Sequence, residues 1–220
     1  DAPAQLERKV TLTDLKGKVL EAVQTVQVVR DTPSLTQNVN KTQVRPGEEV
    51  CFTATVSNTG DAAGEYAVSS LASEELAGDP LEQTLTLDGG KARGLESCYT
   101  VSEDAPDTLE RTVTLESVRG AALEVTNSVE VVRDAPVLTQ TVDKPVAQPG
   151  DEVCFTITVQ NEGTADGDYT LESITADGLE GDSPDEPLPL GLGQSQDFEQ
   201  CFTVAEDAPD TLEREVILTS

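Results

Sequence analysis

Residues 152–161 read Glu-Val-Cys-Phe-Thr-Ile-Thr-Val-Gln-Asn. Apolar and polar side chains alternate along this stretch with a period of two, which predicts a β-strand that buries one face. Pro149-Gly150 precedes the stretch and Gly163 closely follows it, so turn-forming residues stand at both ends. We therefore predict a half-buried strand bounded by turns.

The same pattern recurs 103 positions earlier in the chain. Residues 49–58 read Glu-Val-Cys-Phe-Thr-Ala-Thr-Val-Ser-Asn. A fixed period close to the size of one domain predicts a tandem array, in which each copy buries its own core. We expect three parts: residues 1–29 as terminal strands of a preceding or neighbouring repeat, 30–132 as the first repeat, and 133–220 as a second repeat that lacks its last strand.

Each full repeat contains about seven short alternating stretches separated by Gly, Pro and Asp. In the first repeat they lie near residues 35–39, 50–56, 66–70, 85–87, 95–101, 109–115 and 123–132. Helical periodicity is not convincing anywhere. Many short strands with regular turns are typical of antiparallel β-sandwiches. The predicted fold class is all-β, with tandem immunoglobulin-like sandwich repeats.

Each repeat holds two cysteines in the same register, Cys51 with Cys98 and Cys154 with Cys201. Cys51 falls on the polar parity of its strand, opposite Phe52, so we expect the sulfurs to face outward across adjacent strands. An even count in a fixed register favours one disulfide per repeat and an oxidising compartment. A metal site built on the thiols is the alternative, but the chain has no His to complete it.

The chain carries 42 acidic and 14 basic residues, for a formal net charge of -28. Binding to nucleic acid or to an anionic membrane surface needs Lys and Arg, so we expect neither. No apolar run is long enough to cross a bilayer, and we expect no membrane insertion. The expected location is extracellular, at the cell surface, and the expected partners are copies of the same chain. The sequence does not identify a small-molecule ligand.

The absence of His excludes Ser-His and Cys-His nucleophiles. Two acidic loops, residues 103–110 and 206–213, could in principle pair carboxylates, but the chain has only three Tyr, four Phe and no Trp to build a binding cleft. We expect no enzymatic activity. Arg8, Arg111 and Arg214 recur at strand positions whose neighbours two residues away are apolar. We interpret these arginines as partners of the acidic residues in the two loops.

Calcium is a separate possibility, because acidic loops supply the oxygen ligands that it takes. Asp166 and Asp168 lie in one such loop, and Asp182 lies in another. Neither loop matches the spacing of a calcium motif, so the expected cofactor is none, with calcium left open.

Two boundaries repeat the pattern Val-Val-Arg-Asp-x-Pro, at residues 28–33 and 131–136. Residues 1–29 align with 104–132, and residues 133–220 stop short of an equivalent of residues 118–132. Either the chain is a window of a longer array, or residues 15–29 complete the last repeat of another subunit by strand addition, which would give a head-to-tail fibre. The residues expected at subunit or repeat junctions are Leu20, Val26, Val28, Val29, Arg30, Pro33, Arg133 and Pro136.

Residues 149–165 and 46–62 carry a resemblance to known proteins: both read Pro-Gly-x-Glu-Val-Cys-Phe-Thr and continue to Asn-x-Gly-x-Ala. This motif resembles the immunoglobulin-like repeats of bacterial and archaeal surface proteins, a family known as domain of unknown function eleven. The resemblance implies extracellular stalks, sheaths, surface layers and fibres, and it brings no catalytic residues. The cysteine pair is not a general feature of that family.

These observations lead to one main hypothesis and one alternative. The main hypothesis is a structural extracellular repeat protein that forms a stalk, surface layer or filament. The alternative is an adhesin or binding module whose repeats present a tip or bind calcium.

Overall fold

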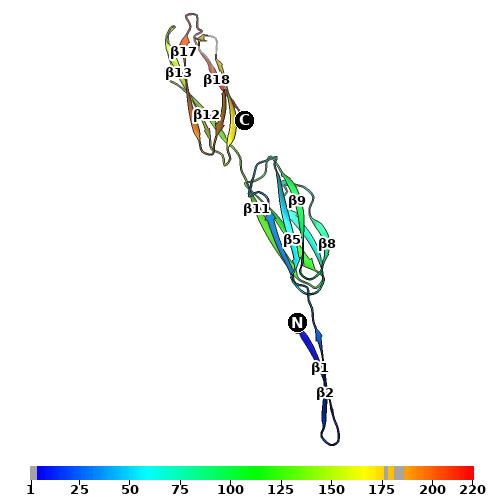
Figure 1. Ribbon diagram of the computed structural model, residues 1–220. Helices are drawn as coiled ribbons and strands as arrows, with labels where there is room; N and C mark the ends of the chain where they lie inside the picture. The colour runs from blue at the N-terminus through cyan, green and yellow to red at the C-terminus, as the bar shows by residue number, and fades with distance from the viewer. Residues whose placement is uncertain (1–3, 176–177, 181–185) are drawn as a thin grey trace. The chain divides into compact units, whose positions relative to one another are not determined.

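The chain folds into β-strands joined by short turns (Figure 1). The structure is a computed structural model that describes residues 4–175, 178–180 and 186–220. The described residues form no helix, and the predicted all-β class is confirmed. The chain divides into two compact units, Asp1–Val131 and Val132–Ser220.

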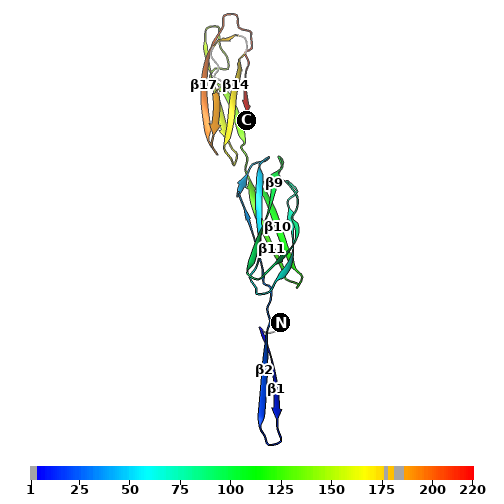
Figure 2. The same cartoon turned by 45° about the vertical axis from the view of Figure 1, so that its right-hand side comes forward.

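Two sheets form the first sandwich, which spans residues 33–131. One sheet has the order β3 (Pro33–Val39), β5 (Glu49–Asn58), β9 (Lys91–Val101) and β7 (Leu76–Ala77). The other has the order β4 (Gln43–Val44), β11 (Ala122–Val131), β10 (Thr108–Ser117), β6 (Gly64–Ala72) and β8 (Glu82–Leu87). Strand β11 lies between β10, with which it pairs antiparallel, and β4, with which it pairs parallel. Figure 2 labels β10 and β11 in this sheet.

The core of the first sandwich follows from the alternation in the sequence. Val50, Phe52, Ala54 and Val56, at every second position of β5, are fully buried. Side chains of β10 and β11 from the other sheet pack against them in two apolar clusters. Burial of one face of each sheet against the other accounts for the sandwich.

The second sandwich, residues 136–219, repeats this arrangement with fewer strands. One sheet has the order β12 (Pro136–Val142), β13 (Glu152–Asn161), β17 (Ser195–Val204) and β15 (Leu179–Glu180). The other has the order β16 (Glu186–Leu190), β14 (Gly167–Thr175) and β18 (Arg214–Thr219). Strand β18 lies where β10 lies in the first sandwich, and among the described residues no strand pairs with its second edge.

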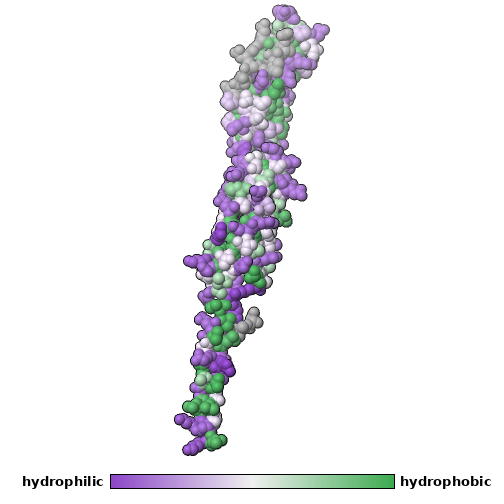
Figure 3. Space-filling model, turned by 90° about the vertical axis from the view of Figure 1, so that its right-hand side faces the viewer, coloured by the Kyte–Doolittle hydropathy of each residue, from purple (hydrophilic) through white to green (hydrophobic). Residues whose placement is uncertain are grey.

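The N-terminal segment forms a hairpin of its own, from β1 (Gln5–Thr13) and β2 (Val19–Gln27). Asp14 closes the turn, because its carboxylate accepts hydrogen bonds from the backbone N–H groups of Lys16 and Lys18. Every residue of both strands is exposed. Apolar side chains therefore lie on the hairpin surface, where Figure 3 shows them in green.

Candidate functional site

Both predicted disulfides are present. Cys51 pairs with Cys98 across β5 and β9, and Cys154 pairs with Cys201 across β13 and β17, with Cα–Cα distances of 4.0 Å in both cases. The sulfurs lie on the outer face, opposite buried Phe52, as parity predicted. Glu49 and Glu152 lie close to the two disulfides, but sulfurs joined to each other offer no thiolate to a metal ion.

A repeated clamp holds the segment that enters each sandwich. We name these segments the straps, residues 30–32 and 133–135. Asn58 Oδ1 accepts hydrogen bonds from the N–H groups of Thr32 at 3.0 Å and Gly60 at 3.1 Å. Its Nδ2 donates to the carbonyls of Ala62 at 2.7 Å and Leu87 at 3.0 Å. The side chain is 1% exposed, so a single buried amide joins strap, turn and β8.

Asn161 forms the same clamp in the second sandwich. Its Oδ1 accepts from the N–H groups of Ala135 and Gly163, and its Nδ2 donates to the carbonyls of Ala165 and Leu190. The sequence indicated only a turn at these asparagines, because two of the four partners of each lie 26 and 29 positions away in the chain. The pattern Asn-x-Gly-x-Ala, which occurs at the same position of both repeats, was the one feature of the sequence that pointed to these asparagines.

The carbonyl of the strap arginine supplies the other half of the clamp. Arg30 accepts hydrogen bonds from the N–H groups of Asp61 at 2.9 Å and Ala62 at 3.1 Å. Arg133 accepts from Thr164 at 2.7 Å and Ala165 at 2.9 Å. Each strap is therefore fixed to the turn of the sandwich that follows it in the chain.

The structure places the predicted junction residues in two groups. Leu20 and Val26 lie on the exposed strand β2, and Val28 and Val29 directly follow that strand. The others belong to the straps or begin the next strand, namely Arg30, Pro33, Arg133 and Pro136. Of these residues, Arg30 and Arg133 take part in the clamp through their backbone carbonyls.

The interpretation of the recurrent arginines needs correction. Arg111 is fully buried, with its guanidinium carbon 5.5 Å from the ring centroid of Phe52 and 5.6 Å from that of Tyr99. Its hydrogen bonds go to Tyr99 and Gln37 and not to the acidic loop. Arg8, on β1, is exposed. Parity showed correctly that Arg111 points inward, but it did not show that aromatic rings and an amide surround it.

Arg214 repeats this arrangement in a less complete core. Its guanidinium carbon lies 5.2 Å from the ring centroids of both Phe155 and Phe202. It donates to the side-chain oxygens of Gln140 and Gln200, and burial lowers the pKa of Arg214. Arg214 and Gln200 are buried, whereas Gln140 is exposed.

Asp166 and Asp168, two of the three calcium candidates, do not belong to a ligand set in the described part of the chain. Asp166 and Asp168 are exposed, and no group of three ligating side chains among the described residues includes either of them. Asp166 accepts a hydrogen bond from the N–H of Leu192, which ties its loop to the turn after β16. Asp182 lies outside the described residues.

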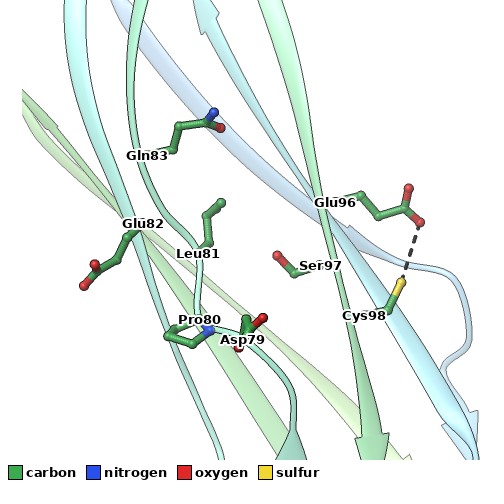
Figure 4. A pocket seen from close by; sticks show the side chains of 8 residues that line it. All are labelled: Asp79, Pro80, Leu81, Glu82, Gln83, Glu96, Ser97 and Cys98. Carbon is green, nitrogen blue, oxygen red and sulfur yellow. Dashed lines mark hydrogen bonds between the residues drawn. The ribbon is translucent and has the colours of Figure 1, made fainter.

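A depression of about 370 Å³ lies beside β8 and β9 (Figure 4). Its lining, residues 79–83 and 96–98, contains three carboxylates and no aromatic or basic side chain. Cys98 Sγ lies 3.9 Å from Glu96 Oε1, but a disulfide sulfur carries no proton to donate. The depression therefore offers neither a sugar-stacking platform nor a nucleophile with its base.

No protein-family model matches the chain, and no curated protein is significantly similar to it. The two disulfides indicate an oxidising environment, as in secreted or extracellular proteins. In the described part of the chain, no helix has the length and apolar character that a bilayer crossing requires.

Proposed function

We propose that this protein is a structural component of an extracellular assembly at the cell surface, such as a stalk, a surface layer or a filament, and that it has no enzymatic role. One observation carries the proposal: a disulfide-bridged sandwich with an asparagine clamp at its entry strap occurs twice, 103 positions apart. Units placed in series add length or avidity, and neither use needs a catalytic cleft.

The disulfides support an extracellular role. Each links the two central strands of one sheet and closes a loop with a sequence separation of 47. In the chain-entropy model a loop of this size stabilises the folded state by about 4 kcal/mol. Such stabilisation suits a protein that works outside the cell, where chaperones do not rescue unfolded chains.

The charge disfavours two classes of partner. A net charge of -28 keeps separate chains apart at low salt and favours neither nucleic acid nor anionic lipid. Ion pairs join Lys9 to Glu21, Lys41 to Glu48 and Arg119 to Asp31. Most Asp and Glu residues in the described part of the chain are exposed and form a hydrophilic surface. Association of copies of this chain would then rest on strand pairing and apolar contacts, at ionic strengths that screen the charge.

The proposal is tested on cells that make the protein. Immunogold electron microscopy should label material outside the cell envelope, and thiol alkylation before lysis should leave all four cysteines unmodified until a reductant is added. Protein found inside the cell with four reactive thiols would contradict both the location and the structural role of the disulfides.

A further inference from the structure

We propose that the Cys51–Cys98 disulfide is an accessible redox site, at which two carboxylates select the charge of the thiol that reduces it. A thiol that carries an amine is favoured, and a thiol that carries a second acidic group is repelled. This inference concerns the chemistry of one disulfide, so it goes beyond the proposed structural function and does not depend on it. It rests on the exposure of one sulfur and on the carboxylates beside both sulfurs.

The disulfide lies on the outer face of the first sandwich. Cys51 on β5 directly opposes Cys98 on β9. Cys98 is exposed and Cys51 is half-buried, whereas their neighbours Phe52 and Tyr99 point into the core. Cys98 also lines the depression beside β8 and β9 (Figure 4). A small thiol can therefore reach Cys98 while the sandwich stays folded.

Two glutamates flank the sulfurs. Glu49 Oε1 lies 3.7 Å from Cys51 Sγ, and Glu96 Oε1 lies 3.9 Å from Cys98 Sγ. Each glutamate precedes its cysteine by two positions, so it lies on the same face of the sheet. Because β5 and β9 are antiparallel, the two glutamates lie on opposite sides of the disulfide along the strands. Both sulfurs are thus beside a carboxylate.

The depression brings further negative charge to Cys98. Asp79 and Glu82 line it together with Glu96, and none of its lining residues is basic. Neither Glu49 nor Glu96 forms an ion pair in the described part of the chain. A reagent that approaches Cys98 therefore meets carboxylates that no described ion pair offsets.

Reduction takes place in two exchange steps. The thiolate of an external thiol attacks Cys98 Sγ, the S–S bond breaks, and Cys51 leaves as a thiolate while Cys98 stays bound to the reagent. A second thiolate attacks the reagent sulfur of this mixed disulfide and releases Cys98 together with a small disulfide. The two cysteine thiolates take up the two protons that the external thiols lost. Two electrons thus pass from the external thiols to the cysteine pair.

The remaining charge of the reagent decides how strongly the carboxylates slow the attack. An ammonium group on the reagent cancels the charge of its thiolate, whereas a sulfonate doubles it. At roughly 7 Å from two carboxylates, one unit of charge changes the rate about fivefold in water at low salt. Molar salt shortens the Debye length to about 3 Å and removes most of this difference.

The test is the rate at which different thiols reduce the folded full chain, followed by alkylation of the released cysteines and mass spectrometry of their peptides. The thiols are cysteamine, 2-mercaptoethanol and 2-mercaptoethanesulfonate. Each rate is divided by the thiolate concentration and by the rate of the same thiol on bis(2-hydroxyethyl) disulfide, which carries no charge. At low salt the relative rate on Cys51–Cys98 should fall about fivefold from cysteamine to 2-mercaptoethanol and about fivefold again to the sulfonate. In molar salt the relative rates should converge.

A pair of variants separates the local carboxylates from the net charge of the chain. Glu49→Gln with Glu96→Gln should remove most of the dependence on reagent charge. Glu116→Gln with Glu124→Gln is the matched control, because it removes the same charge from exposed positions of β10 and β11 in the other sheet. The control should keep the selectivity of the wild type.

Three results would overturn the inference. The first is equal relative rates of the three thiols at low salt. The second is an unchanged selectivity after Glu49→Gln with Glu96→Gln, or an equal loss in the control, which would assign it to the whole chain. The third is a rate that does not depend on thiol concentration, because reduction would then wait for unfolding and the sulfur would not be accessible. The Cys154–Cys201 disulfide is the internal reference, and its rates should be the same in all three proteins.

Discussion

Gln37 and Arg111 bind each other twice in the core of the first sandwich. Arg111 Nη1 donates to Gln37 Oε1, and Gln37 Nε2 donates to the backbone carbonyl of Arg111 at 2.8 Å. The guanidinium lies over the rings of Phe52 and Tyr99, and its Nε donates to the Tyr99 hydroxyl at 3.1 Å. An amide, a hydroxyl and two aromatic faces thus hold the buried cation. In the described structure Arg111 forms no ion pair with a carboxylate.

The replacement Gln37→Leu should therefore destabilise the first sandwich by about 2 kcal/mol, because a buried guanidinium loses a charged hydrogen bond. Gln140→Leu is the matched control in the second sandwich, where the amide is exposed, and it should cost clearly less. Urea unfolding followed by circular dichroism measures both. Equal losses would mean that the burial of Gln37 adds nothing to its contact with Arg111.

The clamp predicts that Gly60 cannot carry a side chain. A Cβ at Gly60 would lie 2.2 Å from the carbonyl oxygen of Arg30 and 2.7 Å from the amide nitrogen of Thr32. Gly60→Ala should thus push the strap off its turn and cost about 1–3 kcal/mol. Hydrogen exchange should show faster exchange of the Asp61 and Ala62 amides. Gly94→Ala is the control, since its Cβ would meet only Thr53 Cγ2, at an ordinary 3.8 Å; a comparable loss there would contradict the clamp argument.

Local alternation was sufficient to predict the long strands and the direction of the sulfurs. The stretch 49–58 is strand β5, and its buried residues fall at the predicted parity. Cys51 and Cys98 pair across β5 and β9 because register and parity together leave the sulfurs facing each other. These features depend on neighbours in the sequence or on an alternation that two strands share.

Features that depend on distant partners could not be predicted. Strands β4 and β7 have two residues each, too few to show a period, and they form only because a neighbouring strand is present. The clamp of Asn58 joins the strap, the turn and β8, and the sequence around Asn58 shows only the turn. Arg111 was wrongly assigned to the acidic loop, because proximity in the chain does not show which rings lie across the core.

Loss of one disulfide should lower the stability of its own sandwich. The pair of changes Cys51→Ser and Cys98→Ser opens a loop with a sequence separation of 47, for an expected loss of about 4 kcal/mol in the chain-entropy model. Cys154→Ser with Cys201→Ser should do the same to the second sandwich, which also has the less complete core. Differential scanning calorimetry should show one transition moved down and the other unmoved. Movement of both transitions by either pair would mean that the sandwiches unfold together.

The buried hydroxyl of Tyr66 leads us to expect that the protein loses stability in alkali. The Tyr66 side chain is fully buried, and burial, followed by the negative charge of nearby Asp31, raises its pKa above the usual value of 10.0. Since the folded-state pKa is raised, the stabilisation is fully present below pH 10.0 and is lost as pH rises through the folded value. Tyr66→Phe should leave stability at pH 7 nearly unchanged and reduce the alkaline loss.

The alkaline loss is measured by urea unfolding at a series of pH values, alongside tyrosinate absorbance of the folded protein. Asp31→Asn supplies a graded control, because removal of the nearby charge should move the tyrosinate transition of Tyr66 to lower pH while its burial remains. Disulfide exchange also accelerates in alkali, but it acts equally on the wild type and on Tyr66→Phe. The same alkaline loss in both proteins would exclude Tyr66 as its source.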